Sequence, residues 1–107
     1  MKDPIDMGIA LLVSAIIVVP ASAQEGDALA GRTVAQNTCA ACHAIRKGQQ
    51  SPNASAPAFD KISSVPGMTA IALQASLQTS HRSMPNLILS TEDRRNVVAY
   101  ILSLQPK

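Results

Sequence analysis

Residues 39–43 read Cys39-Ala40-Ala41-Cys42-His43, and the interpretation of the whole chain depends on this stretch. It contains the only two cysteines of the chain, and an imidazole directly follows the second thiol. The pattern Cys-x-x-Cys-His is typical of covalent haem attachment, in which two thiols add to the two vinyl groups of the porphyrin. Two intervening residues let both thiols reach the ring from one turn of chain. His43 can then bind the iron, because a neutral imidazole nitrogen is a good iron ligand.

Other sites use the same residue types, and they remain open at this point. Two cysteines in an exported protein could form a disulfide. A thioredoxin-like pair also reads Cys-x-x-Cys, but it belongs to a βαβ context that this sequence lacks. A zinc site needs four ligands, and His81 is the only obvious fourth beside Cys39, Cys42 and His43. Haem is favoured because the sequence also predicts a signal peptide before the motif, helices around it, and a methionine late in the chain, Met84, that could be a sixth ligand of the iron.

The first 23 residues predict a cleavable secretory signal peptide, which leaves residues 24–107 as a single domain. Residues 8–19 form an uncharged apolar run of 12 residues. A membrane-spanning helix needs roughly 20, so the run suits the core of a signal peptide instead. Ala21-Ser22-Ala23 supplies the small residues that a signal peptidase recognises, and we expect cleavage after Ala23. An uncleaved N-terminal anchor is the alternative, because Asp3 and Asp6 leave the start of the chain hardly positive.

The segments around the motif predict an all-α fold. Asp27, Thr69 and Ser90 can each cap the start of a helix. No strand-like alternation and no repeat is found. The expected helical segments cover residues 28–38, 59–63 and 70–78 and a C-terminal stretch that begins at Ser90, which makes about three to four helices.

Two long loops and a shortage of aromatic side chains point to a bound group. Residues 44–58 and 79–90 are rich in turn-forming residues, and ordered loops of this length are usually functional. Phe59 and Tyr100 are the only aromatic residues of the chain, so a small domain has little bulk with which to fill its core. Loops wrapped around one covalently bound haem would explain both features.

The charge of the expected mature domain excludes some partners. Residues 24–107 carry eight Lys and Arg against five Asp and Glu, a formal charge of +3. This mildly basic balance, without a Lys/Arg tract or an aromatic stacking platform, does not favour nucleic acid. We expect no membrane span in the mature protein.

Beyond the motif, the sequence resembles the class I c-type cytochromes over nearly all of the mature part. Gly31-x-x-x-Ala35-x-x-x-Cys39 is similar to the first helix of that family, and Ala99-Tyr100-Ile101-Leu102-Ser103-Leu104 is similar to its last helix. The resemblance implies a small mono-haem cytochrome c fold in which these two helices cross at Gly31. It also implies that Tyr100 packs against this glycine.

The resemblance extends to the two loops that face the iron. Ala56-Pro57-Ala58-Phe59 resembles the proximal loop of the family, in which a proline carbonyl accepts the Nδ1 proton of the proximal histidine. Pro57 would therefore orient His43. Ser83-Met84-Pro85 resembles the segment that carries the distal ligand, which implies Met84 as the sixth ligand.

Other residues compete with Met84 for the distal position. His81 is one alternative, and a water-bound or open site is another. Met68 abuts a helix start and is expected to be an ordinary core or surface methionine.

Haem iron with two protein ligands leaves no position for a substrate. The expected function is therefore one-electron transport in the periplasm by a monomer that is not an enzyme, between a redox donor and a redox acceptor. His/Met ligation would raise the reduction potential. The alternatives are a dedicated cytochrome subunit or docking module of a dehydrogenase or oxidase, and a haem enzyme or gas sensor with an open distal site.

A basic rim is expected around the exposed haem edge. Arg46 and Lys47 follow the motif, and Arg82 precedes Met84, whereas the acidic residues lie elsewhere in the sequence. Such a rim would steer a partner with an acidic docking surface.

Overall fold

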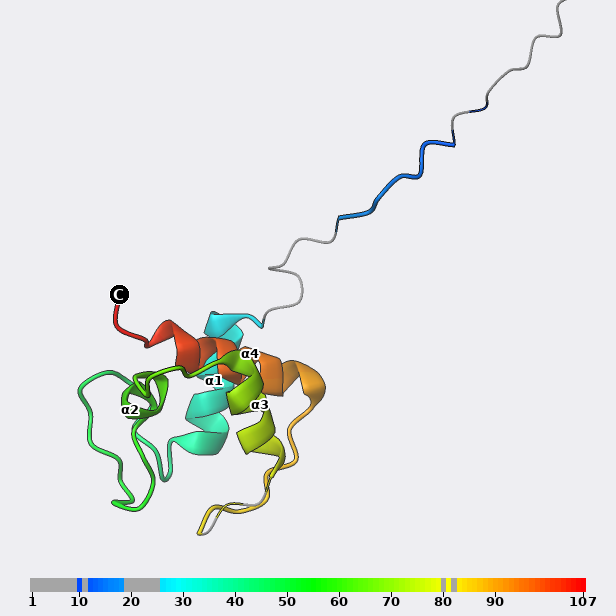
Figure 1. Ribbon diagram of the computed structural model, residues 1–107. Helices are drawn as coiled ribbons and strands as arrows, with labels where there is room; N and C mark the ends of the chain where they lie inside the picture. The colour runs from blue at the N-terminus through cyan, green and yellow to red at the C-terminus, as the bar shows by residue number, and fades with distance from the viewer. Residues whose placement is uncertain (1–9, 11, 19–25, 80, 82) are drawn as a thin grey trace, which may run out of the picture.

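The structure is a computed structural model that describes residues 10, 12–18, 26–79, 81 and 83–107. In this part of the chain all regular elements are helices and no strand occurs, which confirms the all-α prediction (Figure 1). The elements are α1 (Ala28–Val34), the π-helical η2 (Ala35–Cys39), α2 (Phe59–Ser63), α3 (Ala70–Gln78) and α4 (Thr91–Ser103). The predicted cleavage after Ala23 lies outside the described residues, and residues 12–18 form no helix.

The helices begin where the capping residues predict. The side chain of Asp27 accepts a hydrogen bond from Leu29 N at 2.9 Å at the start of α1. Thr69 caps α3, and Ser90 Oγ accepts from Asp93 N at 3.0 Å at the start of α4. Each cap satisfies a backbone N–H that lacks an intrahelical partner.

The first helix differs from its prediction in the last turn. A continuous helix was expected over residues 28–38, but the chain widens into η2, where Ala40 N donates to Ala35 O at 2.9 Å. Gly31, Ala35 and Cys39 are all buried although they lie four residues apart. In an α-helix of 3.6 residues per turn, this spacing drifts by about 40° at each step. The wider turn keeps Cys39 on the buried face.

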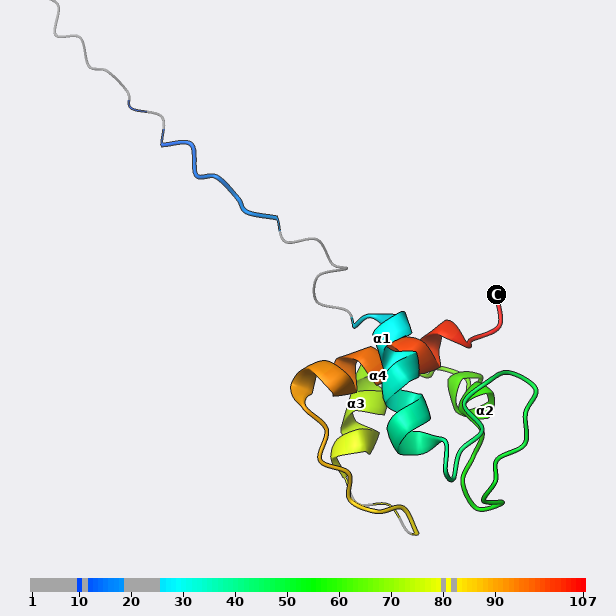
Figure 2. The same ribbon diagram turned by 180° about the vertical axis from the view of Figure 1, so that it is seen from behind.

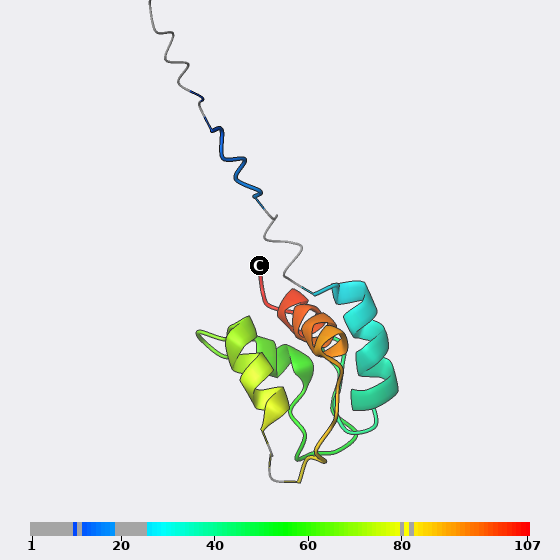
Figure 3. The same ribbon diagram turned by 90° about the vertical axis from the view of Figure 1, so that its right-hand side faces the viewer.

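Helix α4 lies at the centre of the fold, between α1 on one side and α3 on the other (Figure 3). Its contact with α1 is the most extensive contact between helices. Gly26 and Gly31 allow it, because a Cβ at either position would overlap the backbone of α4. Asp27 N also donates to Asn96 Oδ1 at 2.8 Å. The predicted crossing at Gly31 is present, and a Cβ at this position would meet Asn96 O at an even shorter distance than Tyr100 Cβ.

The buried core surrounds α4 and includes side chains of η2, α2, α3 and α4 and of the segment after the motif. Both aromatic residues belong to it. The buried apolar residues are Ala35, Cys39, Ala44, Ile45, Phe59, Leu73, Val97, Val98, Tyr100 and Ile101. The segments over residues 44–58 and 83–90 leave this core toward the same end of the molecule (Figure 2), where they can flank a bound group.

Candidate haem site

The Cys-x-x-Cys-His motif forms one tight turn at the end of η2. Cys42 N and His43 N both point to Cys39 O, at 3.2 and 2.9 Å. Cys39 and Cys42 are not joined in a disulfide, and the imidazole follows them on the same turn. Burial raises the pKa of the Cys39 thiol to about 11, so this thiol is protonated at neutral pH. The motif thus presents its three functional groups from one short stretch of backbone.

The imidazole of His43 is oriented by the loop that follows it. Its Nδ1 atom lies 2.6 Å from Pro57 O. A carbonyl oxygen can only accept a hydrogen bond, so Nδ1 carries a proton, and in the neutral ring the lone pair of Nε2 is free to bind a metal. The ring centroid of His43 also lies 5.4 Å from that of Phe59. The contact that the family resemblance implies for Pro57 is therefore present.

The loop over residues 44–58 is held by hydrogen bonds to the segments on either side of it. Asp60 takes part through Oδ2, whereas its Oδ1 is buried and has no hydrogen-bond partner. The fastening hydrogen bonds are Ala44 N to Ser51 Oγ (3.0 Å), Asn53 N to Cys42 O (3.1 Å), Phe59 N to Ala44 O (2.9 Å) and Gly48 N to Asp60 Oδ2 (2.9 Å). These bonds fix the shape of the loop and therefore hold the Pro57 carbonyl group next to the His43 ring.

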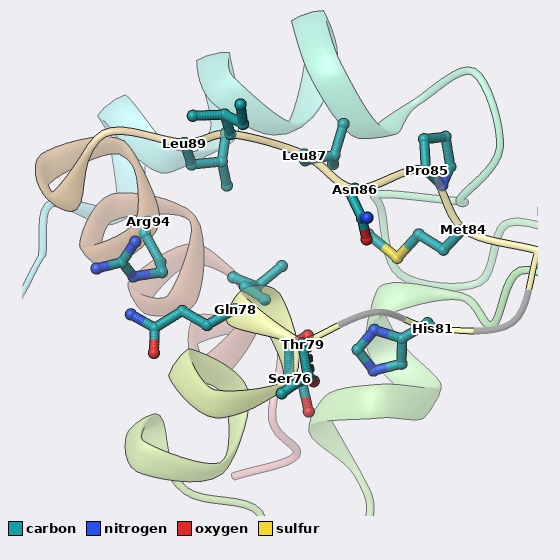
Figure 4. A pocket seen from close by; sticks show the side chains of 12 residues that line it. Ser76, Gln78, Thr79, His81, Met84, Pro85, Asn86, Leu87, Leu89 and Arg94 are labelled. Carbon is teal, nitrogen blue, oxygen red and sulfur yellow. Dashed lines mark hydrogen bonds between the residues drawn. The ribbon is translucent and has the colours of Figure 1, made fainter.

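Met84 and His81 lie together at one end of a cavity of about 330 Å³ (Figure 4). They are paired across a tight turn, in which Met84 N donates to His81 O at 3.3 Å. Ser83 occupies the left-handed region in this turn, with φ 67°. The cavity lies between the end of α3 and residues 84–89, and Arg94 borders its opposite end. Both candidate distal ligands thus border the same space.

The other candidates have different surroundings. Met68 is partly buried and packs against the core, as expected for an ordinary methionine. Within residues 26–79, 81 and 83–107, no three His, Cys, Asp and Glu side chains are grouped to hold a metal ion. Arg46 and Lys47 are exposed, and Arg82 lies outside the described residues.

The donor set fits an iron porphyrin. Two free thiols and an imidazole with an available Nε2 come from one turn, and a cavity bordered by a thioether and a second imidazole lies at the end of α3. Neutral nitrogen and thioether sulfur are established axial ligands of haem iron.

Comparisons with known proteins agree with this donor set. The family model described as cytochrome c oxidase, cbb3-type, subunit III matches residues 26–101. The chain is also 34% identical over 95 residues to cytochrome c-552 of Bradyrhizobium diazoefficiens, in an alignment that covers 89% of this chain and 91% of that protein. No solved structure matches at a significant level. The chain belongs to this family of c-type cytochromes.

As a c-type cytochrome, the chain carries haem c bound covalently through Cys39 and Cys42, and it is an electron carrier. The predictions of family, cofactor and electron transport are confirmed. Its reaction requires redox partners. None of the helices in the described part of the chain is both long and apolar enough to cross a membrane.

The sequence did not reveal every residue that supports this cytochrome site. Ser51 binds Ala44 N, and the hydroxyl group of Tyr100 donates to Ile45 O at 2.5 Å. The only signal for Ser51 was its place in a turn-rich loop. Tyr100 was expected to pack against Gly31, but nothing in its position predicted a bond to a carbonyl 55 residues away.

Proposed function

We propose that this cytochrome is a periplasmic one-electron carrier in which His43 and Met84 are the two axial ligands. The observation that carries the proposal is the hydrogen bond from His43 Nδ1 to Pro57 O, at 2.6 Å. It supports His43 as the proximal ligand, because in the neutral ring it puts the proton on Nδ1 and the lone pair on Nε2, and because it holds the ring in one orientation. When bound, haem supplies a couple between ferric and ferrous iron.

Met84 is a better candidate for the distal ligand than His81. Met84 is half-buried beside the cavity, whereas His81 is exposed. A neutral thioether is a soft ligand that favours ferrous over ferric iron and raises the reduction potential. A ligand of this kind suits an electron carrier, because the same two ligands can stay on the iron in both the ferric and the ferrous state.

Two protein ligands also argue against an enzyme. An iron held by both His43 and Met84 would have no coordination position left for a substrate. The chain would then only bind the haem, hold its ligands and limit the access of water.

Export to the periplasm is supported by the sequence of residues 1–23. An apolar run of 12 residues precedes Ala21-Ser22-Ala23, as in a cleavable signal peptide. N-terminal sequencing of the holo protein from an exporting host should begin at Gln24. A chain that begins at Met1 and stays in the membrane fraction would support the anchored alternative instead.

A second candidate function is that of a dedicated cytochrome subunit. The matching family model is described as an oxidase subunit, which favours this reading, whereas the relative from Bradyrhizobium is named as a cytochrome c-552. Native purification distinguishes the two. A free carrier elutes alone at the mass of the monomer, and a subunit co-elutes with a larger redox complex.

Optical spectra of the oxidised and reduced protein, with and without carbon monoxide, test the ligands. Wild-type protein should be low-spin in both states and should not bind carbon monoxide readily. Met84→Ala should open the distal position and allow rapid carbon monoxide binding, whereas His81→Ala should behave like wild type. If His81→Ala opens the position and Met84→Ala does not, the assignment of Met84 is wrong.

A further inference from the structure

The backbone directly after His43 is tied to the C-terminal helix through Tyr100. The hydroxyl group of Tyr100 donates to Ile45 O at 2.5 Å. Both residues are buried, with exposed fractions of 7% for Tyr100 and 6% for Ile45. The bond therefore lies in a protected environment, where an unpaired carbonyl would be costly.

This bond completes a set of restraints on three backbone groups that follow His43. Ser51 Oγ accepts from Ala44 N at 3.0 Å, and Phe59 N donates to Ala44 O at 2.9 Å. Ser51 and Phe59 lie in or beside the loop that also carries Pro57. Tyr100 is the member of this set that comes from α4, so its bond joins the His43 segment to the centre of the fold.

Aromatic contacts form a second link between Tyr100 and the His43 segment. The ring of Phe59 lies between the other two rings, with its centroid 5.4 Å from that of His43 and 6.4 Å from that of Tyr100. Phe59 thus links the His43 ring to the Tyr100 ring by aromatic contacts. A change at Tyr100 that keeps the ring would leave this packing in place and alter only the hydrogen bond.

We propose that Tyr100 is a positioning residue for the proximal ligand, and that its hydroxyl group holds Ile45 so that His43 Nδ1 keeps its short bond to Pro57 O. The inference rests on the proposed ligation by His43. A hydrogen bond to Nδ1–H makes an imidazole a more basic ligand, and a more basic ligand stabilises ferric iron. Tyr100 therefore lowers the reduction potential through the backbone at Ile45, and it is not itself one of the proposed ligands.

Tyr100→Phe is the direct test, because it removes the hydroxyl group and keeps the ring. We expect the reduction potential of the holo protein to rise. We also expect the His43 Nδ1 proton to exchange with solvent roughly tenfold faster in NMR spectra, as for the loss of one buried hydrogen bond.

Ser103→Ala is the matched control. Ser103 Oγ donates to Tyr100 O within α4, so this variant also loses one side-chain hydrogen bond of the same helix but none near His43. It should keep the wild-type potential and exchange rate. Equal values in Tyr100→Phe, Ser103→Ala and wild type would overturn the proposal, because Tyr100 would then only add stability.

A rescue variant keeps the proposal testable if Tyr100→Phe gives too little holo protein. Incorporation of 4-aminophenylalanine at position 100 restores a donor to Ile45 O, and it should return the potential and the exchange rate toward wild type. Failure of this rescue in a folded holo protein also contradicts the proposal. If wild-type protein itself shows no histidine ligation, the proposed function fails, and this outcome is distinct from a failure of the Tyr100 variants.

Discussion

Gly31 of α1 lies directly against the backbone of Asn96 in α4. A Cβ atom at position 31 would be 1.8 Å from Asn96 O, which is far too short for two non-bonded atoms. The contact is thus between two backbones, and neither side can relieve a clash by rotating a side chain. The helix pair that supports the haem motif depends on the absence of a single methyl group.

The first prediction is that Gly31→Ala destabilises the holo protein by about 1–3 kcal/mol through overpacking. Helix propensity alone predicts the opposite, since Ala is favoured over Gly by about 1 kcal/mol inside a helix. Denaturant unfolding measures the difference. Thr33→Ala, at an exposed position of the same helix, should change stability by less than about 0.5 kcal/mol. A Gly31→Ala variant as stable as wild type would contradict the close contact.

The second prediction concerns the covalent bond to haem. Protein matured in an exporting host should keep its red colour after acid–acetone extraction, and its mass should exceed that of the processed chain by one haem. Cys39→Ala and Cys42→Ala should each remove one thioether bond, whereas Ser51→Ala should retain both. Complete extraction of the colour from wild-type protein is the outcome that contradicts this prediction.

The third prediction is that the chain without haem is largely disordered, because the domain is small and contains only two aromatic residues. Circular dichroism of a Cys39→Ser, Cys42→Ser chain should show little helix and no sharp thermal transition. Alkylation of the wild-type apo chain is a second measurement. In a disordered chain both thiols react at similar rates, whereas burial that raises the pKa of Cys39 to about 11 would make it much slower than Cys42.

The fourth prediction is that the basic side chains after the motif steer an acidic redox partner. Lys47 is exposed and follows His43 by four residues in the sequence. The second-order rate of electron transfer to such a partner should fall as salt is added, because at 0.1 M salt charges more than about 10 Å apart are largely screened. Lys47→Glu should lower this rate at low salt and leave the optical spectrum unchanged. Arg95→Glu, which makes the same change of charge at an exposed position of α4, should have a smaller effect. A rate that ignores both salt and Lys47→Glu excludes a docking rim centred on Lys47.

The parts of the fold that could be predicted from the sequence are those that depend on near neighbours. The caps at Asp27, Thr69 and Ser90 act on N–H groups two or three residues away, so the starts of three helices followed from local chemistry. The end of the first helix was less predictable. Its π-helical turn arises because Cys39 must stay buried with Ala35, and this requirement comes from packing against other elements.

The chemistry of the haem motif could also be predicted from the sequence alone, since two thiols and an imidazole at this spacing are typical of covalent haem attachment. Tertiary structure decided what holds that motif in place. Loop closure brought Pro57 O to His43 Nδ1, and the crossing of α1 and α4 placed the Tyr100 hydroxyl group at Ile45 O. These contacts join residues 14 and 55 positions apart. No local pattern specifies such pairs, because their geometry exists only once the separate segments pack around one core.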